Sequence, residues 1–413
     1  MIATFLKRAL IISATRFVAL SLAMVDMIML GHTNMLAVQD YTLASQVAQV
    51  FVILAVVLSI GINIVIGQNK EAPRQTAQEI LGYSICLGVV LLVISLLVGQ
   101  FFDASNHATQ SYFILSISIF PLAIYVGLCN ILEAQGLEKK VLAVTIVSAI
   151  ANIAFNYIAI ANIDNASVAV SISTLAIRVL TLLPVIYLGF KNQLIATPRF
   201  NKEKVGILVN FGRTEALTSI CFTGGISILV LTFASLYSQE HTAYLGFALN
   251  FMNSFSVLYV GLVISLSISL SQMDKSSNEP YSMLTIMFGY ILVSAFGLIL
   301  LAEAISQIYT PTATNELVKA LKLSVAVIAI DGIALVFISW LRVRGFSQLP
   351  PLFRLAMIFV GLPGAFFINA FDNPVLNIIF FMALGNLIAA LASMVYFVFR
   401  IKHKSEALLG AHQ

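Results

Sequence analysis

Carboxylate and amide side chains stand inside several of the long apolar stretches of this sequence. A charged side chain near the centre of a bilayer costs at least about 2.5 to 3.5 kcal/mol, so each such group is a functional candidate. A carboxylate there either holds a proton or is compensated by a bound cation, and the residue type does not separate the two. The alternative is that each group merely hydrogen-bonds a neighbouring helix. The candidates are Asp26, Asn152, Asn156, Glu215 and Asp331.

The positions of these candidates along the expected helices divide them into two groups. Asp26 lies roughly 26 Å along a helix that starts near residue 9, at about 1.5 Å per residue. Asn152 and Asn156 have i, i+4 spacing, which places them on one helical face. We expect these three residues to share one site at one depth. Glu215 and Asp331 match each other in depth and form a second pair in the other half of the chain.

Three arginines also fall within apolar stretches. Arg16 and Arg213 are close enough to the expected cytoplasmic ends for their side chains to reach the interface. Arg178 lies deeper, so we expect it to have either a carboxylate partner or an anionic substrate.

The composition is that of a membrane protein. Hydrophobic residues make up 60% of the chain and charged residues only 10%, whereas soluble domains have about 25% charged residues. Spanning a bilayer takes about 20 apolar residues. The sequence therefore predicts an all-α integral membrane protein with about twelve transmembrane helices. They are expected at 9–31, 41–66, 80–100, 111–134, 141–161, 166–190, 205–236, 242–272, 282–302, 317–341, 352–370 and 374–399.

The loops between these segments alternate in charge. Most of the 22 Lys and Arg residues fall in every second loop or at the ends of the chain. Because cytoplasmic loops are enriched in Lys and Arg, we expect an even number of spans, with both termini cytoplasmic, in the inner (plasma) membrane.

The two halves of the sequence repeat loosely. Gln68 corresponds to Gln272, and Gly136 to Gly345. With six spans in each half, the repeats are parallel and related by an axis along the membrane normal. We expect two pseudo-symmetric six-helix bundles: an N-terminal lobe at 1–190, a cytoplasmic linker at 191–204, a C-terminal lobe at 205–399 and a cytoplasmic tail at 400–413.

Several strings, in this order, resemble the multidrug and toxic compound extrusion (MATE) family. Residues 25–31, with Asp26, are similar to the family's first-helix motif, and residues 130–134 to the end of its fourth helix. Residues 152–158 resemble the asparagine pair of the sodium-driven bacterial branch. Asp331 and residues 361–363 resemble the tenth and eleventh helices.

The resemblance implies roles for particular residues. Asp26 and the asparagine pair would line a cation and substrate site in the N-terminal lobe, and Asp331 would be the carboxylate of a sodium site in the C-terminal lobe. Na⁺ would thus bind at Asp331 or Asp26, while Glu133 and Arg178 are secondary candidates. The chain departs from the family at Phe222, where a glutamate is often found. Either Glu215 substitutes for that glutamate, or the second site is incomplete.

The function implied by the resemblance is antiport. An inward gradient of Na⁺ or H⁺ would drive export of amphipathic, cationic organic compounds by rocking of the two bundles. The partners would be small organic substrates and the lipid bilayer, with no cofactor, no nucleic acid and a monomeric chain. The alternative within transport is a flippase for lipid-linked oligosaccharide or polysaccharide, for which Arg178 and Arg16 would suit a pyrophosphate. An enzyme is not expected, because the sequence has no metal-ligand spacing, phosphate loop or nucleophile motif.

Overall fold

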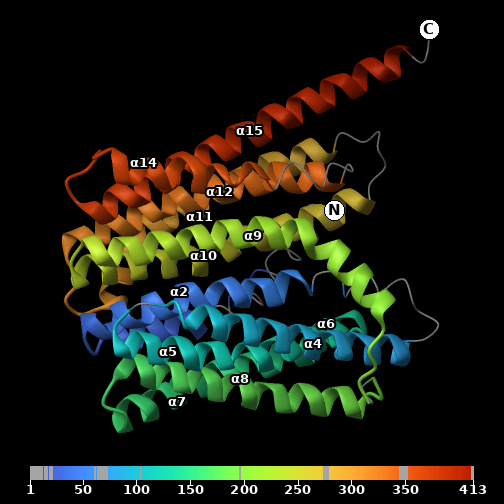
Figure 1. Cartoon of the computed structure of the whole chain (residues 1–413). Coiled ribbons are helices and arrows are strands. Elements are labelled where there is room, and N and C mark those ends of the chain that lie inside the picture. The colour runs from blue at the N-terminus through green and yellow to red at the C-terminus, as the bar shows by residue number, and fades with distance from the viewer. Residues whose placement is uncertain are drawn as a thin grey trace. The chain divides into compact units, whose positions relative to one another are not determined.

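The computed structural model consists of helices joined by turns and loops over the residues that it describes, which are 13, 17, 22–59, 62, 73–102, 104–194, 197–272, 279–343 and 352–410 (Figure 1). A first helical stretch covers Leu22–Gly31. The helices that follow are α2 (Met35–Val57), α4 (Pro73–Gly99), α5 (Asn106–Ile117), α6 (Ile119–Ala134), α7 (Glu138–Asn162), α8 (Ala166–Lys191), α9 (Lys202–Leu236), α10 (Gln239–Gln272), α11 (Glu279–Tyr309), α12 (Asn315–Val343), a π-helical turn η1 (Met357–Gly361), α14 (Leu362–Phe367) and α15 (Pro374–Gly410).

Each apolar segment expected from the sequence contains helical structure. Among the described residues, 9 helices are long and apolar enough to cross a membrane, so the prediction of a multi-pass helical protein is confirmed. The expected total of twelve spans and the two six-helix bundles remain predictions. The chain divides by its internal contacts into one unit of Ser21–Gly246 and another of Met1–Leu20 with Phe247–Gln413.

Short polar side chains mark where helices begin in the unit Ser21–Gly246. The Asn34 side chain accepts a hydrogen bond from the backbone N–H of Ala37 at 2.7 Å and caps α2. Ser105 caps α5 in the same way, and Asn165 caps α8. These caps satisfy backbone N–H groups that have no partner within the helix. They fix where α2, α5 and α8 start and therefore which of their residues meet.

The exposed and buried faces of α7 are reversed relative to a soluble protein. Its exposed face has large apolar side chains, such as Val147 at 66% exposure and Tyr157 at 72%. Its buried face is mainly polar, with Thr145, Ser148, Asn152 and Asn156 following Val141. Exposed apolar surface is stable in contact with lipid, whereas buried polar groups need hydrogen-bond partners. The helix α7 therefore places a polar stripe against its neighbours.

Contacts among the helices of this unit fix the surroundings of that stripe. Helix α7 packs on α8, α5 packs on both α2 and α8, and α9 packs on α2. Helices α5 and α6 together form one membrane-crossing stretch, Asn106–Ala134, that is interrupted at Ser118. The Ser118 hydroxyl at this interruption accepts a hydrogen bond from Arg178 of α8.

In the other unit, α12 packs on α11 and α15, and η1 packs on α15. The backbones of η1 and α15 approach very closely. A Cβ atom added at Gly361 would lie 2.6 Å from the carbonyl oxygen of Phe381, and one added at Gly385 would lie 2.5 Å from the Cα of Met357. Glycine is therefore required at both positions for this crossing, which holds the segment after residue 356 against α15.

Candidate functional site

Asp26 is the centre of a buried hydrogen-bond cluster. Its side chain is 2% exposed. The Nδ2 atoms of Asn152 and Asn156 donate to its Oδ1 atom at 2.9 and 2.7 Å. The Tyr41 hydroxyl and the Thr174 hydroxyl donate to its Oδ2 atom at 2.9 and 3.2 Å. Four helical segments thus converge on one carboxylate: Leu22–Gly31, α2, α7 and α8.

The predicted meeting of Asp26 with Asn152 and Asn156 is found in the structure. The two asparagines lie one helical turn apart on the buried stripe of α7, so both amide groups reach the same oxygen. This contact joins residues more than 120 positions apart, as their numbers show. The spacing therefore predicted the geometry correctly, while the role of the cluster in cation coupling stays a prediction.

Neutral donors compensate the Asp26 carboxylate. An ionised carboxylate only accepts hydrogen bonds and has room for about four donors. Asp26 has that number, although the Thr174 hydroxyl also points at the Val170 carbonyl at 3.0 Å and shares its hydrogen. No ion pair to Asp26 is present in the part of the chain that the structure describes. The carboxylate is therefore oriented and solvated by dipoles rather than neutralised by a fixed charge.

One buried oxygen beside Asp26 lacks a hydrogen-bond partner. The Oδ1 atom of Asn156 has none in the described structure, although the residue is 0% exposed. Its Nδ2 atom donates to Asp26, so the amide oxygen belongs to the same cluster. Carboxylate and amide oxygens are the usual ligands of hard cations. The arrangement therefore offers oxygen ligands that fit a small cation such as Na⁺.

Among the residues that the structure describes, Arg178 does not pair with a carboxylate, contrary to one of the two expectations from the sequence. Its Nη1 atom donates to the Ser118 Oγ at 2.6 Å, and no carboxylate lies within ion-pair distance of it among the described residues. Asp26 and Tyr41 are within electrostatic range of the guanidinium. The Asp26 oxygens accept hydrogen bonds from neutral donors, and Arg178 donates to the Ser118 hydroxyl between α5 and α6.

Asp331 has a different environment from Asp26. The Nε and Nη2 atoms of Arg354 donate to its Oδ1 and Oδ2 atoms at 3.2 and 3.1 Å. The Asp331 side chain is 14% exposed and the Arg354 side chain 25%. Asp331 thus forms a two-pronged ion pair with Arg354. The side chain of Glu215 lies outside the described residues, as does Arg16.

The structure also describes the remaining secondary candidate, Glu133, and two further residues named in the sequence analysis. Glu133 is half-buried near the end of α6, Arg213 is exposed on α9, and Phe222 is half-buried on α9. No group of three or more His, Cys, Asp and Glu side chains suited to a metal ion occurs in the described part of the chain.

The sequence interpretation missed three members of the site: Tyr41, Thr174 and Ser118. Thr174 lies one turn before Arg178 on α8, so its position on the same face was available as a signal. Tyr41 had no comparable signal. A further buried carboxylate, Asp40, was also missed, because it falls at the edge of an expected span. It is 2% exposed, and its Oδ1 accepts a hydrogen bond from the Ser105 hydroxyl at 2.6 Å.

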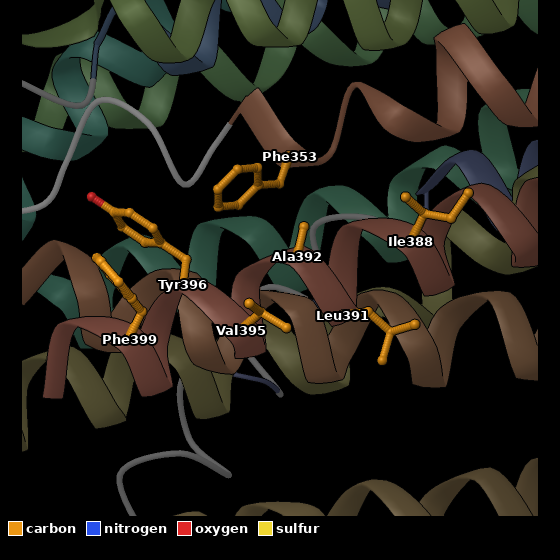
Figure 2. Close-up of a pocket in the computed structure, with 7 residues that line it drawn as sticks. All are labelled: Phe353, Ile388, Leu391, Ala392, Val395, Tyr396 and Phe399. Atoms are coloured by element: carbon orange, nitrogen blue, oxygen red, sulfur yellow. The ribbon is translucent and has the colours of Figure 1, made fainter. Parts of the chain in front are cut away.

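An open apolar groove of about 560 Å³ lies on the exposed side of α15. Phe353 reaches toward α15, along which the other lining residues lie (Figure 2). The groove contains none of the predicted site residues. Its lining residues are Phe353, Ile388, Leu391, Ala392, Val395, Tyr396 and Phe399.

Residues 12–158 match the family model MatE. This region contains Asp26, Tyr41 and both asparagines of the cluster. The chain as a whole superimposes on solved transporters along nearly all of its length. An inward-facing multidrug resistance MATE family transporter of the MOP superfamily matches with a TM-score of 0.81 at 16% identity, over 94% of this chain and 96% of the other. The fold is that of MATE transporters.

Two other solved MATE structures also match nearly the whole chain. An outward-facing MATE transporter matches with a TM-score of 0.71 at 14% identity, over 97% of this chain and 96% of the other. A MATE in the bent conformation matches with a TM-score of 0.65 at 16% identity, over 98% and 97% of the two chains. No curated protein sequence matches the chain. The MatE model covers less than half of the chain, and these solved structures are at most 16% identical to it, so the comparisons show the fold. The sodium-driven branch stays a prediction.

Proposed function

We propose that the chain is a secondary active exporter of the MATE type. An inward gradient of Na⁺ or H⁺ drives export of amphipathic, cationic organic compounds from the cell. The observation that carries the proposal is the buried Asp26 carboxylate, which four neutral donors surround without an ion-pair partner among the described residues. The family model, which covers this residue, supports transport as the class of function.

Asp26 provides the exchange step in this proposal. A negative charge held by dipoles attracts any monovalent cation that reaches it, because no fixed charge has to leave first. A proton or Na⁺ neutralises the carboxylate, and a cationic organic compound competes for the same charge. Binding of one species therefore displaces the other. A ligand that binds one conformation more tightly shifts the population toward that conformation, which couples the exchange to alternating access.

The neutral donors have distinct tasks in this scheme. Asn152 and Asn156 hold Oδ1, and Tyr41 and Thr174 hold Oδ2, so the carboxylate keeps one orientation. The unpartnered Oδ1 atom of Asn156 adds an oxygen ligand beside the carboxylate, which favours Na⁺ without excluding H⁺. Both termini in the cytoplasm, an inner-membrane location and a monomeric chain complete the proposal, and all three rest on the sequence.

The experiment is transport in proteoliposomes with Na⁺ and H⁺ gradients imposed separately. We expect one gradient, and not the other, to drive uptake or release of a cationic dye. The matched control is Asp164→Asn, which changes an exposed loop aspartate and should transport like the unmodified protein. If neither gradient moved any of a panel of cationic dyes, the exporter proposal would be wrong.

A second candidate function, a lipid flippase, is favoured by one observation. Arg178 binds a hydroxyl rather than a carboxylate, so its charge remains available to an anionic group such as a pyrophosphate. On that proposal, fluorescent lipid pyrophosphates and not cationic dyes would cross proteoliposome membranes. Substitution of Arg178 by glutamine would abolish that movement.

A further inference from the structure

The Asp331 carboxylate already has a cation, and that cation is part of the chain. Arg354 contacts both oxygens of Asp331 through two nitrogens, at 3.2 and 3.1 Å. A guanidinium cannot lose its proton in proteins, so its charge is permanent. The two-pronged geometry is the strongest form of arginine–carboxylate pair. A free cation that is to bind the same two oxygens must therefore first displace Arg354.

The segment that holds Arg354 contacts α15 at both ends of its described part. Arg354 is followed within three positions by the π-helical turn Met357–Gly361. Such turns are rare and are frequently found at functional sites. The crossing of Gly361 over α15 fixes the far end of the segment. At the near end, Phe353 touches Tyr396 edge to face, at 5.8 Å between ring centroids, beside the open groove (Figure 2).

We propose that Arg354 is a tethered counter-cation that occupies Asp331 and excludes free cations from it. This inference rests on the proposed function in one point only, namely that the chain couples transport to a cation. It deepens that function by identifying which of the two carboxylates can bind a free cation. Asp26 is held by neutral donors, so among the described residues a mobile cation has no fixed positive charge to displace there. Asp331 is closed by Arg354. The chain therefore couples through Asp26, and Asp331 becomes a cation site only when Arg354 is removed.

The pair has a predictable response to the loss of its arginine. Without Arg354, the Asp331 carboxylate is left partly buried and uncompensated, which is unfavourable. Na⁺ at the same oxygens restores the balance of charge. Because a ligand that binds only the folded state stabilises it in proportion to its occupancy, Na⁺ should stabilise such a variant more strongly than it stabilises the unmodified protein.

The test is the thermal unfolding midpoint of the full chain in nanodiscs, titrated with NaCl against choline chloride at constant ionic strength. For Arg354→Gln we expect a new Na⁺-dependent rise, half complete at about tenfold lower Na⁺ than any rise in the unmodified protein. The double variant Asp331→Asn with Arg354→Gln should lose that rise. Arg213→Gln, which removes an exposed arginine, should behave like the unmodified protein. An Arg354→Gln protein that responds to Na⁺ like the unmodified protein would overturn the proposal.

A second measurement serves if Arg354→Gln does not fold. Asp331→Asn in the otherwise unmodified chain should keep whatever Na⁺ response the unmodified protein has, because Asp331 is closed, whereas Asp26→Asn should lose it. Loss of the response in Asp331→Asn would overturn the proposal. The transport assay is separate from both measurements. If gradient-driven transport fails while Arg354→Gln still shows the new Na⁺-dependent rise in its unfolding midpoint, the exporter function is refuted. The proposed role of Arg354 then still holds.

Discussion

Replacement of Asp26 by asparagine removes the charge at the centre of the cluster and almost nothing else. The new amide oxygen can accept from Asn152 and Asn156 as Oδ1 does now. The new NH₂ group would take the place of Oδ2, where the hydroxyls of Tyr41 and Thr174 can rotate and accept instead of donate. The shape of the cluster and its hydrogen bonds are therefore retained.

The expected change in stability is small because two effects oppose each other. A hydrogen bond to a charged group contributes about 1.5–3 kcal/mol and a neutral one about 0.5–1.5 kcal/mol, so four bonds together lose roughly 4–6 kcal/mol. Removal of a buried charge returns several kcal/mol of desolvation free energy. The free energy of unfolding of Asp26→Asn should thus stay within about 2 kcal/mol of the unmodified protein.

Export, by contrast, should fall to the level of empty liposomes. An asparagine side chain is neutral in every state, so it cannot bind and release a cation or a proton. The assay compares dye transport in proteoliposomes with the thermal unfolding of the same preparation, and Asp164→Asn is the matched control. An Asp26→Asn protein that unfolds normally and exports dye at the unmodified rate would refute the coupling role. A protein that does not fold would refute the energetic reasoning above.

Three further predictions follow from the contacts of the same unit. Tyr41→Phe should destabilise the fold by about 1.5–3 kcal/mol, the contribution of a hydrogen bond to a charged group, and thermal unfolding would show whether the hydroxyl matters. Arg178→Gln should lower the free energy of unfolding by a similar amount, not by the 3–5 kcal/mol of a broken buried ion pair, and a double-mutant cycle with Ser118→Ala should reveal their coupling. A cysteine placed at Asp164 should react with an impermeant thiol reagent from outside the cell, and one at Lys191 should not; the reverse pattern would invert the predicted topology.

The sequence predicted the Asn152 and Asn156 pair because a helical period determines which residues of one helix share a face. It also predicted the depth of Asp26 in the membrane. Depth and helical face together were enough to predict that Asp26 meets Asn152 and Asn156. Tyr41 and Thr174 could not be predicted in this way. Each lies on a different helix, and the rotation of α2 and α8 about their own axes depends on contacts with helices far away in the sequence.

The partners of Arg178 and Asp331 could not be predicted from the sequence for a related reason. The depth of Arg178 was clear, but its partner depends on the interruption at Ser118, which the apolar segment 111–134 did not reveal. The sequence predicted that Asp331 binds a free cation. Arg354, near the start of the expected span 352–370, was not identified as its partner, because a sequence position near the end of a span does not show how far a long side chain extends. In the structure it reaches Asp331.

The contact between Arg178 and Ser118 bears directly on whether Asp26 can exchange cations. If the Arg178 guanidinium were paired with Asp26, the carboxylate would be closed in the same way as Asp331 is by Arg354. Instead, Ser118 binds the guanidinium at 2.6 Å, and neutral donors occupy the carboxylate. The positive charge remains in electrostatic range of Asp26, where it weakens the attraction of a bound cation without replacing it. A site that must release its cation in every cycle benefits from such weakening, because binding that is too tight would hold the transporter in one state. Ser118→Ala, which frees Arg178 to approach Asp26, should therefore reduce transport even though Ser118 itself does not touch the carboxylate.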